Sequence, residues 1–203
     1  MAEKGLLVVV SGPAGSGKGT VNGILLEREN FVFSVSATTR SPRPGEKHGV
    51  NYYYITHEEF EKRIAAGEML EYTTYCDNYY GTPKKEAEAV LESGKNLLLE
   101  IEVDGAMQVK KKYPDAVLIM LLPPSFSAQE ERLRGRGTEP ADVILKRLEQ
   151  ARSEVETAPK YDYIVYNRDN AVVECVEDIM TIIRAEKLAS KRNKNVVENY
   201  YNN

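Results

Sequence analysis

The stretch Gly12-Pro13-Ala14-Gly15-Ser16-Gly17-Lys18-Gly19-Thr20 decides the fold of this chain. It follows an apolar run at residues 6–10 and precedes a helix-like segment at residues 21–29. A strand, a loop of the form G-x-x-x-x-G-K and a helix start are typical of a site in which backbone N–H groups surround a phosphate and the lysine adds a mobile positive charge. The sequence therefore predicts a loop that binds a polyphosphate.

One position of the loop departs from that pattern. The pattern has Ser or Thr directly after the lysine, where the hydroxyl meets a magnesium ion, whereas here Gly19 stands between Lys18 and Thr20. We expect the phosphate-binding backbone to be kept. Contact of Thr20 with the metal, directly or through water, stays open.

Length and composition are those of an ordinary globular chain. Its 203 residues are 42% hydrophobic and 29% charged, which suits one substantial core with small inserted lobes. The net charge of −4 does not favour a nucleic-acid or membrane surface, so an anionic ligand must be met by local clusters of Arg and Lys. Cys76 and Cys175 lack metal-type spacing, and the N-terminus lacks the apolar stretch of a signal peptide. We therefore expect a cytoplasmic protein that binds neither nucleic acid nor membrane.

Apolar runs of strand length recur after the loop. Residues 96–102 and 116–122 are continuous enough for buried strands, and a helical segment at 104–113 separates them. Shorter strands are expected at 31–36 and 163–166. This alternation predicts an α/β fold in which a parallel sheet lies between layers of helices.

Residues 37–85 interrupt the core pattern and indicate a small inserted α+β lobe. The lobe starts with a basic, turn-rich loop, and strands are expected at 52–55 and 70–74. A capping box from Thr56 to Glu59 predicts a helix between these strands. A strand end or turn follows at residues 78–81, and Thr82 with Pro83 predicts the start of the next helix.

A second interruption, at residues 127–157, reads as two helices, the first opened by Ser127. The parallel-sheet core would then consist of residues 1–36, 86–126 and 158–203. The closing helix is expected to be capped by Asn170 and to face the core through Val172, Val176, Ile179 and Ile183. A solvated, basic helix end is expected at Lys187, Lys191, Arg192 and Lys194, and the C-terminal tail is expected at 189–203.

The segment Thr38-Thr39-Arg40-Ser41-Pro42-Arg43-Pro44-Gly45-Glu46-Lys47-His48-Gly49-Val50-Asn51-Tyr52-Tyr53-Tyr54-Ile55 closely resembles the signature of guanylate kinases, which are P-loop nucleoside monophosphate kinases. The resemblance continues in unbroken order through residues 68–72, 78–82, 134–138 and 161–163, and covers about residues 5–188. It implies a P-loop NTPase core of three layers, a GMP-binding lobe at 37–85 and a helical lid at 127–157.

The activity implied by this resemblance is transfer of a phosphoryl group from ATP to GMP, and to dGMP, with Mg²⁺, for synthesis and recycling of guanine nucleotides. On the acceptor side, Arg40, Arg43, Tyr52 and Tyr80 match residues that hold the GMP phosphate. The residues that match contacts to the base are Ser36, Glu71, Thr82 and Glu102. Guanine presents N1–H and an amine as adjacent donors, which suit the carboxylate of Glu71. The family more often has Asp at position 102, so Glu102 is equally readable as an exposed strand carboxylate.

On the donor side, the resemblance implies that Lys18 reaches the β- and γ-phosphates. Arg136 and Arg147 match lid arginines that act with Lys18 and Arg43 on the transferring group. Arg132 and Asn167 match contacts to ATP. Glu100, at the end of a core strand, is a candidate partner of Mg²⁺ through water.

Two other functions stay open. Guanylate-kinase-like domains also serve as peptide-binding modules in scaffold proteins, although such modules typically lose the loop lysine or the catalytic arginines that this chain keeps. The Gly19–Thr20 variant is shared with adenylate kinases, which raises the possibility of a kinase for another monophosphate. The sequence does not determine the oligomeric state, and a homo-oligomer is compatible with it.

Overall fold

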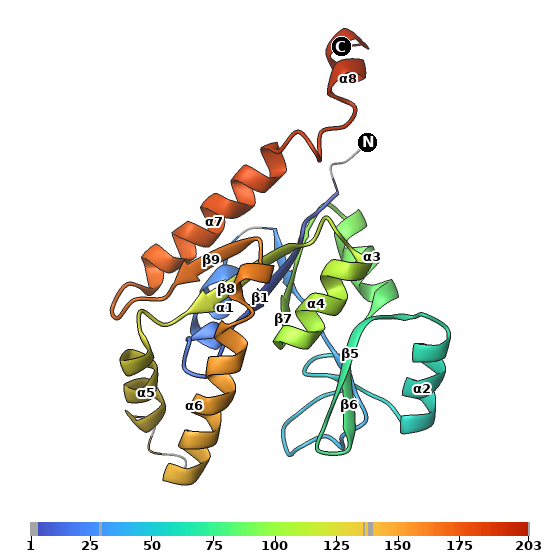
Figure 1. Ribbon diagram of the computed structural model, residues 1–203. Coiled ribbons are helices and arrows are strands. Elements are labelled where there is room, and N and C mark those ends of the chain that lie inside the picture. Colours follow the sequence, from blue (N-terminus) through green and yellow to red (C-terminus); the bar gives the residue numbers. More distant parts are fainter. Residues whose placement is uncertain (1–3, 29, 136, 138–139, 203) are drawn as a thin grey trace.

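The computed structural model describes residues 4–28, 30–135, 137 and 140–202. At its centre lies a parallel sheet of five strands in the order β2-β7-β1-β8-β9 (Figure 1). The strands are β2 (Phe31–Phe33), β7 (Asn96–Glu100), β1 (Leu7–Ser11), β8 (Val117–Leu122) and β9 (Tyr163–Tyr166). The predicted α/β class with a parallel sheet is confirmed, and the glycine-rich loop leaves the central strand of that sheet.

Helices cover both faces of the sheet. They are α1 (Lys18–Leu26), α3 (Lys84–Glu92), α4 (Val103–Lys112) and α7 (Val172–Leu188). Alternate residues of β1 point to opposite faces, so Val8 and Val10 pack with α1 and α7, whereas Val9 packs with α3 and α4. Burial on both faces explains why these strands read as continuous apolar runs. No helix in the described part of the chain is long and apolar enough to cross a membrane.

A second sheet of four strands, in the order β4-β3-β6-β5, lies beside the core (Figure 1). Its strands are β3 (Ala37–Thr38), β4 (Tyr53–Tyr54), β5 (Met69–Tyr75) and β6 (Asn78–Pro83). Helix α2 (His57–Ala65) covers the sheet, and Phe60 stacks on Tyr79 with 5.0 Å between ring centroids. The predicted cap is confirmed, because Thr56 Oγ1 accepts a hydrogen bond from the Glu59 N–H at 3.1 Å.

The helix predicted to start at Thr82 and Pro83 is present, but its start is displaced. Both residues belong to β6, where Thr82 pairs with Glu71 and Pro83 with Met69. Helix α3 begins one residue later, at Lys84. Pro83 is thus both the last residue of β6 and the residue that directly precedes α3.

Helices α5 (Phe126–Gly135) and α6 (Ala141–Val155) form a pair on the other side of the core (Figure 1). Their contact is apolar, and Ala14 of the glycine-rich loop packs against the cluster of Leu133, Ile144 and Leu148. Ser125, rather than the predicted Ser127, caps α5, because its hydroxyl accepts a hydrogen bond from the Ala128 N–H at 3.1 Å. A short 3-10 helix, η1 (Ala158–Lys160), leads from α6 to β9.

The chain after α7 is attached to the core through a buried carboxylate. Glu186 is 6% exposed and accepts hydrogen bonds from Tyr163 Oη at 2.6 Å and Arg192 Nη2 at 2.7 Å. The prediction that Arg192 belongs to a solvated helix end is therefore wrong, since a buried charge requires a partner of opposite charge. Helix α8 (Val196–Asn202) follows and points away from the sheet (Figure 1).

The predicted cap of α7 is also wrong. Asn170 adopts a left-handed conformation with φ of 58°, and Ala171 is the residue that precedes the helix. Asparagine tolerates this conformation better than most residues, so Asn170 turns the chain into the helix instead of capping it.

The Glu186 cluster predicts sensitivity to acid. Burial raises the pKa of Glu186, but hydrogen bonds from Tyr163, Arg192 and Lys191 outweigh burial and lower it from 4.5 to about 2. The resulting stabilisation is complete above pH 4.5 and is lost as the pH falls from 4.5 toward 2. We expect Glu186→Gln to lower the free energy of unfolding by roughly 2–4 kcal/mol at pH 7 and to weaken its acid dependence.

Urea unfolding at pH 7 and pH 3 measures both effects. Glu198→Gln, at an exposed position of α8, is the control and should leave stability unchanged. Equal stability of the Glu186 variant and the parent at pH 7 would contradict the prediction.

Candidate active site

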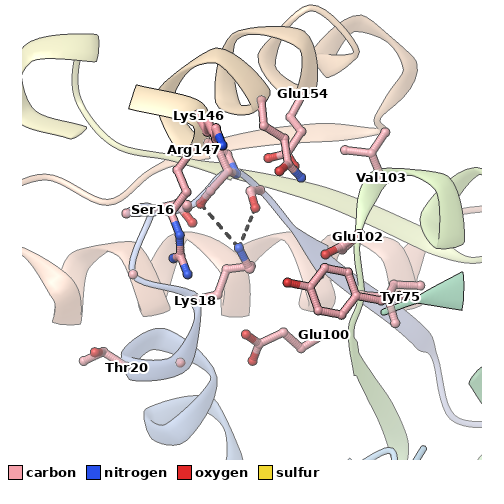
Figure 2. Close-up of a pocket in the computed structure, with 18 of the residues that line it drawn as sticks. Ser16, Lys18, Thr20, Tyr75, Glu100, Glu102, Val103, Lys146, Arg147 and Glu154 are labelled. Carbon is pink, nitrogen blue, oxygen red and sulfur yellow. Dashed lines mark hydrogen bonds between the residues drawn. The ribbon is translucent and has the colours of Figure 1, made fainter. Parts of the chain in front are cut away.

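A cavity of about 960 Å³ opens beside the loop 12–20, and we call it the donor cavity (Figure 2). The loop forms one wall, residues 100–103 at the end of β7 form a second, and α6 forms a third. Tyr75 contributes from the second sheet. The residues that line it from α6 are Val143, Lys146, Arg147, Gln150 and Glu154. Basic side chains from the loop and from α6 therefore border the same space.

The loop has a conformation that glycine allows. Gly17 precedes α1 with φ of 87°, and a Cβ atom there would lie 2.3 Å from Asn167 Nδ2. The loop lies between the carboxyl end of β1 and the N-terminus of α1, where N–H groups and the helix dipole attract an anion. This geometry supports the predicted phosphate loop.

Two amide side chains that do not line the donor cavity donate hydrogen bonds to carbonyl groups of the loop. Gln129 Nε2 donates to the carbonyl of Ala14 at 2.7 Å, and Asn167 Nδ2 donates to that of Ser16 at 2.9 Å. Neither amide is among the residues that line the donor cavity. These bonds therefore direct the carbonyl oxygens away from the space that a phosphate would occupy.

Arg132 braces the same loop. Its guanidinium donates to the carbonyls of Gly15 at 3.3 Å and Asn167 at 2.8 Å, and it pairs with Asp169 at 2.7 Å. Arg132 thus joins α5 to the loop and to the segment after β9. The predicted contacts of Arg132 and Asn167 with ATP stay predictions.

Sequence reasoning missed Gln129 and Asp169. Gln129 is 2% exposed and lies three positions before Arg132 on α5, so both side chains point to one face of the helix. That spacing is the signal that could have found Gln129. Asp169 follows a strand end without any distinguishing pattern in the sequence.

Lys18 lies at the start of α1 with its ammonium group over the loop. Its Nζ donates to the carbonyls of Gly12 and Pro13 (dashed lines in Figure 2). Arg147 lines the cavity from α6. Burial raises the pKa of Glu154 on the same helix, and the positive charge of Lys18 acts in the opposite direction. The structure therefore brings Lys18, Arg147 and Glu154 to one cavity.

A smaller cavity of about 320 Å³, which we call the acceptor cavity, lies between the two sheets. Its lining residues are Ser36, Tyr52, Glu71, Thr73, Tyr75, Tyr80, Glu100, Ile101, Glu102 and Gly105. Five of the predicted acceptor residues are thus brought together, namely Ser36, Tyr52, Glu71, Tyr80 and Glu102. Thr82 lines an adjoining space of about 290 Å³ that shares Ser36 and Tyr52 with the acceptor cavity.

Glu71 is the buried carboxyl group of the acceptor cavity. It is 3% exposed, and its Oε1 accepts a hydrogen bond from Thr82 Oγ1 at 2.8 Å. A Cβ atom on Gly105 would lie 2.9 Å from Oε2, so glycine at that position of α4 makes room for the carboxyl group. Burial raises the pKa of Glu71, and the hydrogen bond from Thr82 opposes that effect. Hydrogen-bond donors of a ligand would stabilise the charged form of this group.

Arg40 is held by a residue that sequence reasoning did not single out. Glu46 accepts two hydrogen bonds from the Arg40 guanidinium, both at 3.0 Å, and one from Tyr54 Oη at 2.8 Å. The bond with Arg40 lowers the pKa of Glu46 to about 2. The Arg40 guanidinium lies 5.6 Å from the ring centre of Tyr52, which lines the acceptor cavity. Glu46 therefore fixes the orientation of the Arg40 guanidinium, which is predicted to bind the GMP phosphate.

One predicted catalytic arginine, Arg43, does not line either cavity. Arg43 is exposed, and its backbone N–H donates to Glu46 Oε2 at 2.7 Å. Its side chain is not among the residues that line the cavities. Arg136 lies outside the described residues.

The two candidate metal residues line the donor cavity from two of its walls, the loop and the end of β7. Thr20 and Glu100 both line it, and Glu100 Oε2 accepts a hydrogen bond from Asn22 Nδ2 at 2.7 Å. Within the described ranges there is no group of three or more His, Cys, Asp or Glu side chains that could hold a metal ion. This arrangement fits Mg²⁺, which keeps several waters and is commonly held by one or two carboxylates together with nucleotide phosphates.

The bond from Gln129 predicts an effect on nucleotide affinity. We expect Gln129→Met to weaken binding of ATP about tenfold, because the Ala14 carbonyl would lose the donor that keeps it away from the phosphates. Titration calorimetry with a non-hydrolysable ATP analogue measures the affinity. Gln108→Met is the matched control, since it removes a 2.8 Å bond from a glutamine amide to the Tyr72 carbonyl in the second sheet. Equal affinities of the two variants would refute the role of Gln129.

Comparison with known proteins agrees with this geometry. Residues 4–186 match the family model for guanylate kinase. The chain is 48% identical over 191 residues to a guanylate kinase of Oceanobacillus iheyensis, with 94% of this chain and 92% of that one covered. It is 49% identical over 201 residues to one of Lactococcus lactis, with coverages of 98% and 96%.

The fold agrees as well. The crystal structure of guanylate kinase from Anaplasma phagocytophilum superposes with a TM-score of 0.71 at 34% identity, and the match covers 94% of this chain and 90% of that one. Sequence and structure thus match over nearly the whole length of the relatives. The chain therefore belongs to the guanylate kinase family.

Proposed function

We propose that the protein transfers the γ-phosphoryl group of ATP to GMP, giving ADP and GDP, with ATP on the loop 12–20 and GMP in the acceptor cavity. Membership of the guanylate kinase family makes the chain an ATP:GMP phosphotransferase. The observation that carries this assignment of sites is that both cavities share Tyr75, Glu100, Ile101 and Glu102. Nucleotides in the two cavities would therefore meet with their phosphates at this common wall.

Charge placement is the main task of the donor side. Phosphoryl transfer proceeds through a loose transition state, so positioning and electrostatic stabilisation supply most of the rate. Lys18 would leave the carbonyls of Gly12 and Pro13 and bind the β- and γ-phosphates. Arg147 would add positive charge from α6, and Arg136 is proposed to act with it on the strength of its motif.

The acceptor side would use Arg40, Arg43, Tyr52 and Tyr80 for the GMP phosphate. Glu46 supports this role because it presents the planar Arg40 guanidinium beside Tyr52 in a fixed orientation. Arg43, which is exposed on the lobe, would reach the phosphate only when the lobe moves toward the core. We therefore propose that the lobe closes over GMP.

Recognition of the base rests on Glu71. Guanine offers N1–H and an amine to a carboxylate, whereas adenine offers an acceptor at N1 and would leave the buried group without a donor. Ser36 and Thr82 are proposed as hydroxyl contacts and Glu102 as a second acidic contact to the base. A site with buried polar groups discriminates by roughly 10⁴ against a ligand that leaves those groups unpaired.

Mg²⁺ is proposed as the cofactor, bound mainly by the nucleotide phosphates. Glu100 would contact it through water and Thr20 directly or through water, with Asn22 keeping the Glu100 carboxylate in place. When bound, the ion supplies charge neutralisation of the phosphates.

GMP and dGMP are proposed as acceptors ahead of other monophosphates. The residues of the two cavities argue against a peptide-binding module and against a kinase for another monophosphate. Lys18, Arg40, Arg147 and the loop geometry favour the enzyme over the module. Glu71 favours a guanine over an adenine base.

One assay tests these assignments. We expect turnover of ATP with GMP and dGMP, and little with AMP, UMP or CMP, in an assay that couples ADP release to NADH oxidation. Lys18→Ala should abolish turnover while the circular dichroism spectrum stays that of the parent. If Lys18→Ala kept activity within tenfold of the parent, the assignment of the donor site would be wrong. If the parent preferred AMP to GMP, AMP would replace GMP as the assigned acceptor.

The variant Glu71→Gln distinguishes an effect on the GMP site from an effect on the ATP site. We expect KM for GMP to rise about 100-fold and KM for ATP to stay within twofold, because the change removes one acceptor from the buried group and leaves the donor cavity intact. Glu68→Gln, at an exposed position of the same lobe, is the control and should behave as the parent. Equal shifts of both Michaelis constants would rule out the role at the base.

A further inference from the structure

Strand β5 presents one row of side chains to the acceptor cavity. Glu71, Thr73 and Tyr75 alternate along the strand and all line that cavity. Tyr72 lies on the opposite face and packs in the apolar cluster around Phe60. The side chain that is proposed to recognise the base and Tyr75 therefore belong to one face of one strand.

Tyr75 lines the donor cavity as well as the acceptor cavity, whereas Glu71 and Thr73 line the acceptor cavity alone. Among the described residues that line the donor cavity, it is the one that comes from the second sheet. Its ring projects into that cavity beside Glu102, and its hydroxyl points toward the side that holds Lys18 (Figure 2). The residue is 66% exposed, so it is open to a ligand in either cavity.

The distance between Glu71 and Tyr75 along β5 matches the length of a mononucleotide. Tyr75 lies four positions after Glu71, which corresponds to about 13 Å of extended chain. This length is on the order of that between the base edge and the phosphate of a nucleoside monophosphate. Pairing of β5 with β6 from Met69 to Tyr75 makes the separation rigid, and a two-residue turn at Cys76 and Asp77 closes the hairpin.

The Tyr75 hydroxyl has the chemistry of a hydrogen-bond donor to phosphate. A hydrogen bond with the Cys76 thiol raises the pKa of Tyr75, Glu102 acts in the same direction and Arg147 in the opposite direction. The phenol therefore stays protonated near neutral pH. Arg147 of α6 and Glu102 of the wall that both cavities share line the donor cavity together with Tyr75.

We propose that the Tyr75 hydroxyl donates a hydrogen bond to the phosphoryl group during its transfer, and that β5 thereby links recognition of the base at Glu71 to the reaction. This inference rests on the proposed function. Because Tyr75 moves with the lobe, its hydroxyl would be held at the transferring group only when a guanine nucleotide occupies the acceptor cavity. Tyr75 would thus favour transfer to GMP over transfer to water.

Tyr75→Phe removes the hydroxyl and keeps the ring. We expect kcat with GMP to fall about tenfold and the Michaelis constants for ATP and GMP to stay within twofold, because the bond is strongest in the transition state. The melting temperature should not change, since the side chain is exposed. Tyr79→Phe is the matched control on the opposite face of the same hairpin, and it should keep the parent kcat.

A kcat of Tyr75→Phe within twofold of the parent would overturn the inference. So would a rise in KM for GMP at unchanged kcat, which would make Tyr75 a simple binding residue. Tyr75→Leu separates ring from hydroxyl: a loss confined to Leu assigns the effect to packing and overturns the proposal, whereas equal losses in Phe and Leu support it. Turnover of GMP by the parent is measured first, so that failure of the proposed function is distinguished from failure of the role of Tyr75.

Discussion

The structure depends on the hydrogen bonds that hold the carbonyl groups of the loop 12–20 from outside. Gln129 and Asn167 bind the carbonyls of Ala14 and Ser16, and these two donors come from α5 and from the end of β9. A loop so rich in glycine could otherwise turn its oxygens toward the cavity, where they would repel a phosphate. The phosphate site is therefore a property of three segments that are far apart in the sequence.

The acceptor side follows the same physical rule, in which hydrogen bonds fix the polar groups of a site before a ligand arrives. Glu46 orients Arg40 through two bonds of 3.0 Å, and Thr82 orients the buried carboxyl group of Glu71. Preorganisation of this kind reduces the conformational freedom that a ligand must remove when it binds. The motion that we propose is that of the lobe relative to the core, and it would bring Arg43 and Tyr75 toward the phosphates.

Much of the fold could be predicted, because strands buried on both faces leave continuous apolar runs and glycine spacing is a local signal. Most predicted acceptor residues meet in one cavity. Tyr52 belongs to the contiguous signature, and Glu71 and Tyr80 belong to one hairpin. The failures occurred where tertiary contacts overrode local signals. Thr82 reads as part of a helix start but pairs with Glu71 in β6, and Arg192 reads as solvated but binds the buried carboxylate of Glu186.

By itself, the sequence determined the α/β class, the phosphate loop and the resemblance to guanylate kinases, because all three are written in short contiguous patterns. Only the tertiary structure decided that Gln129 holds the loop, that Arg132 braces it, and that Tyr75 enters the donor cavity from the acceptor lobe. Gln129 and Ala14 lie 115 positions apart. A hydrogen bond over that separation depends on how helices and sheets pack, and packing leaves no periodic trace in a single chain.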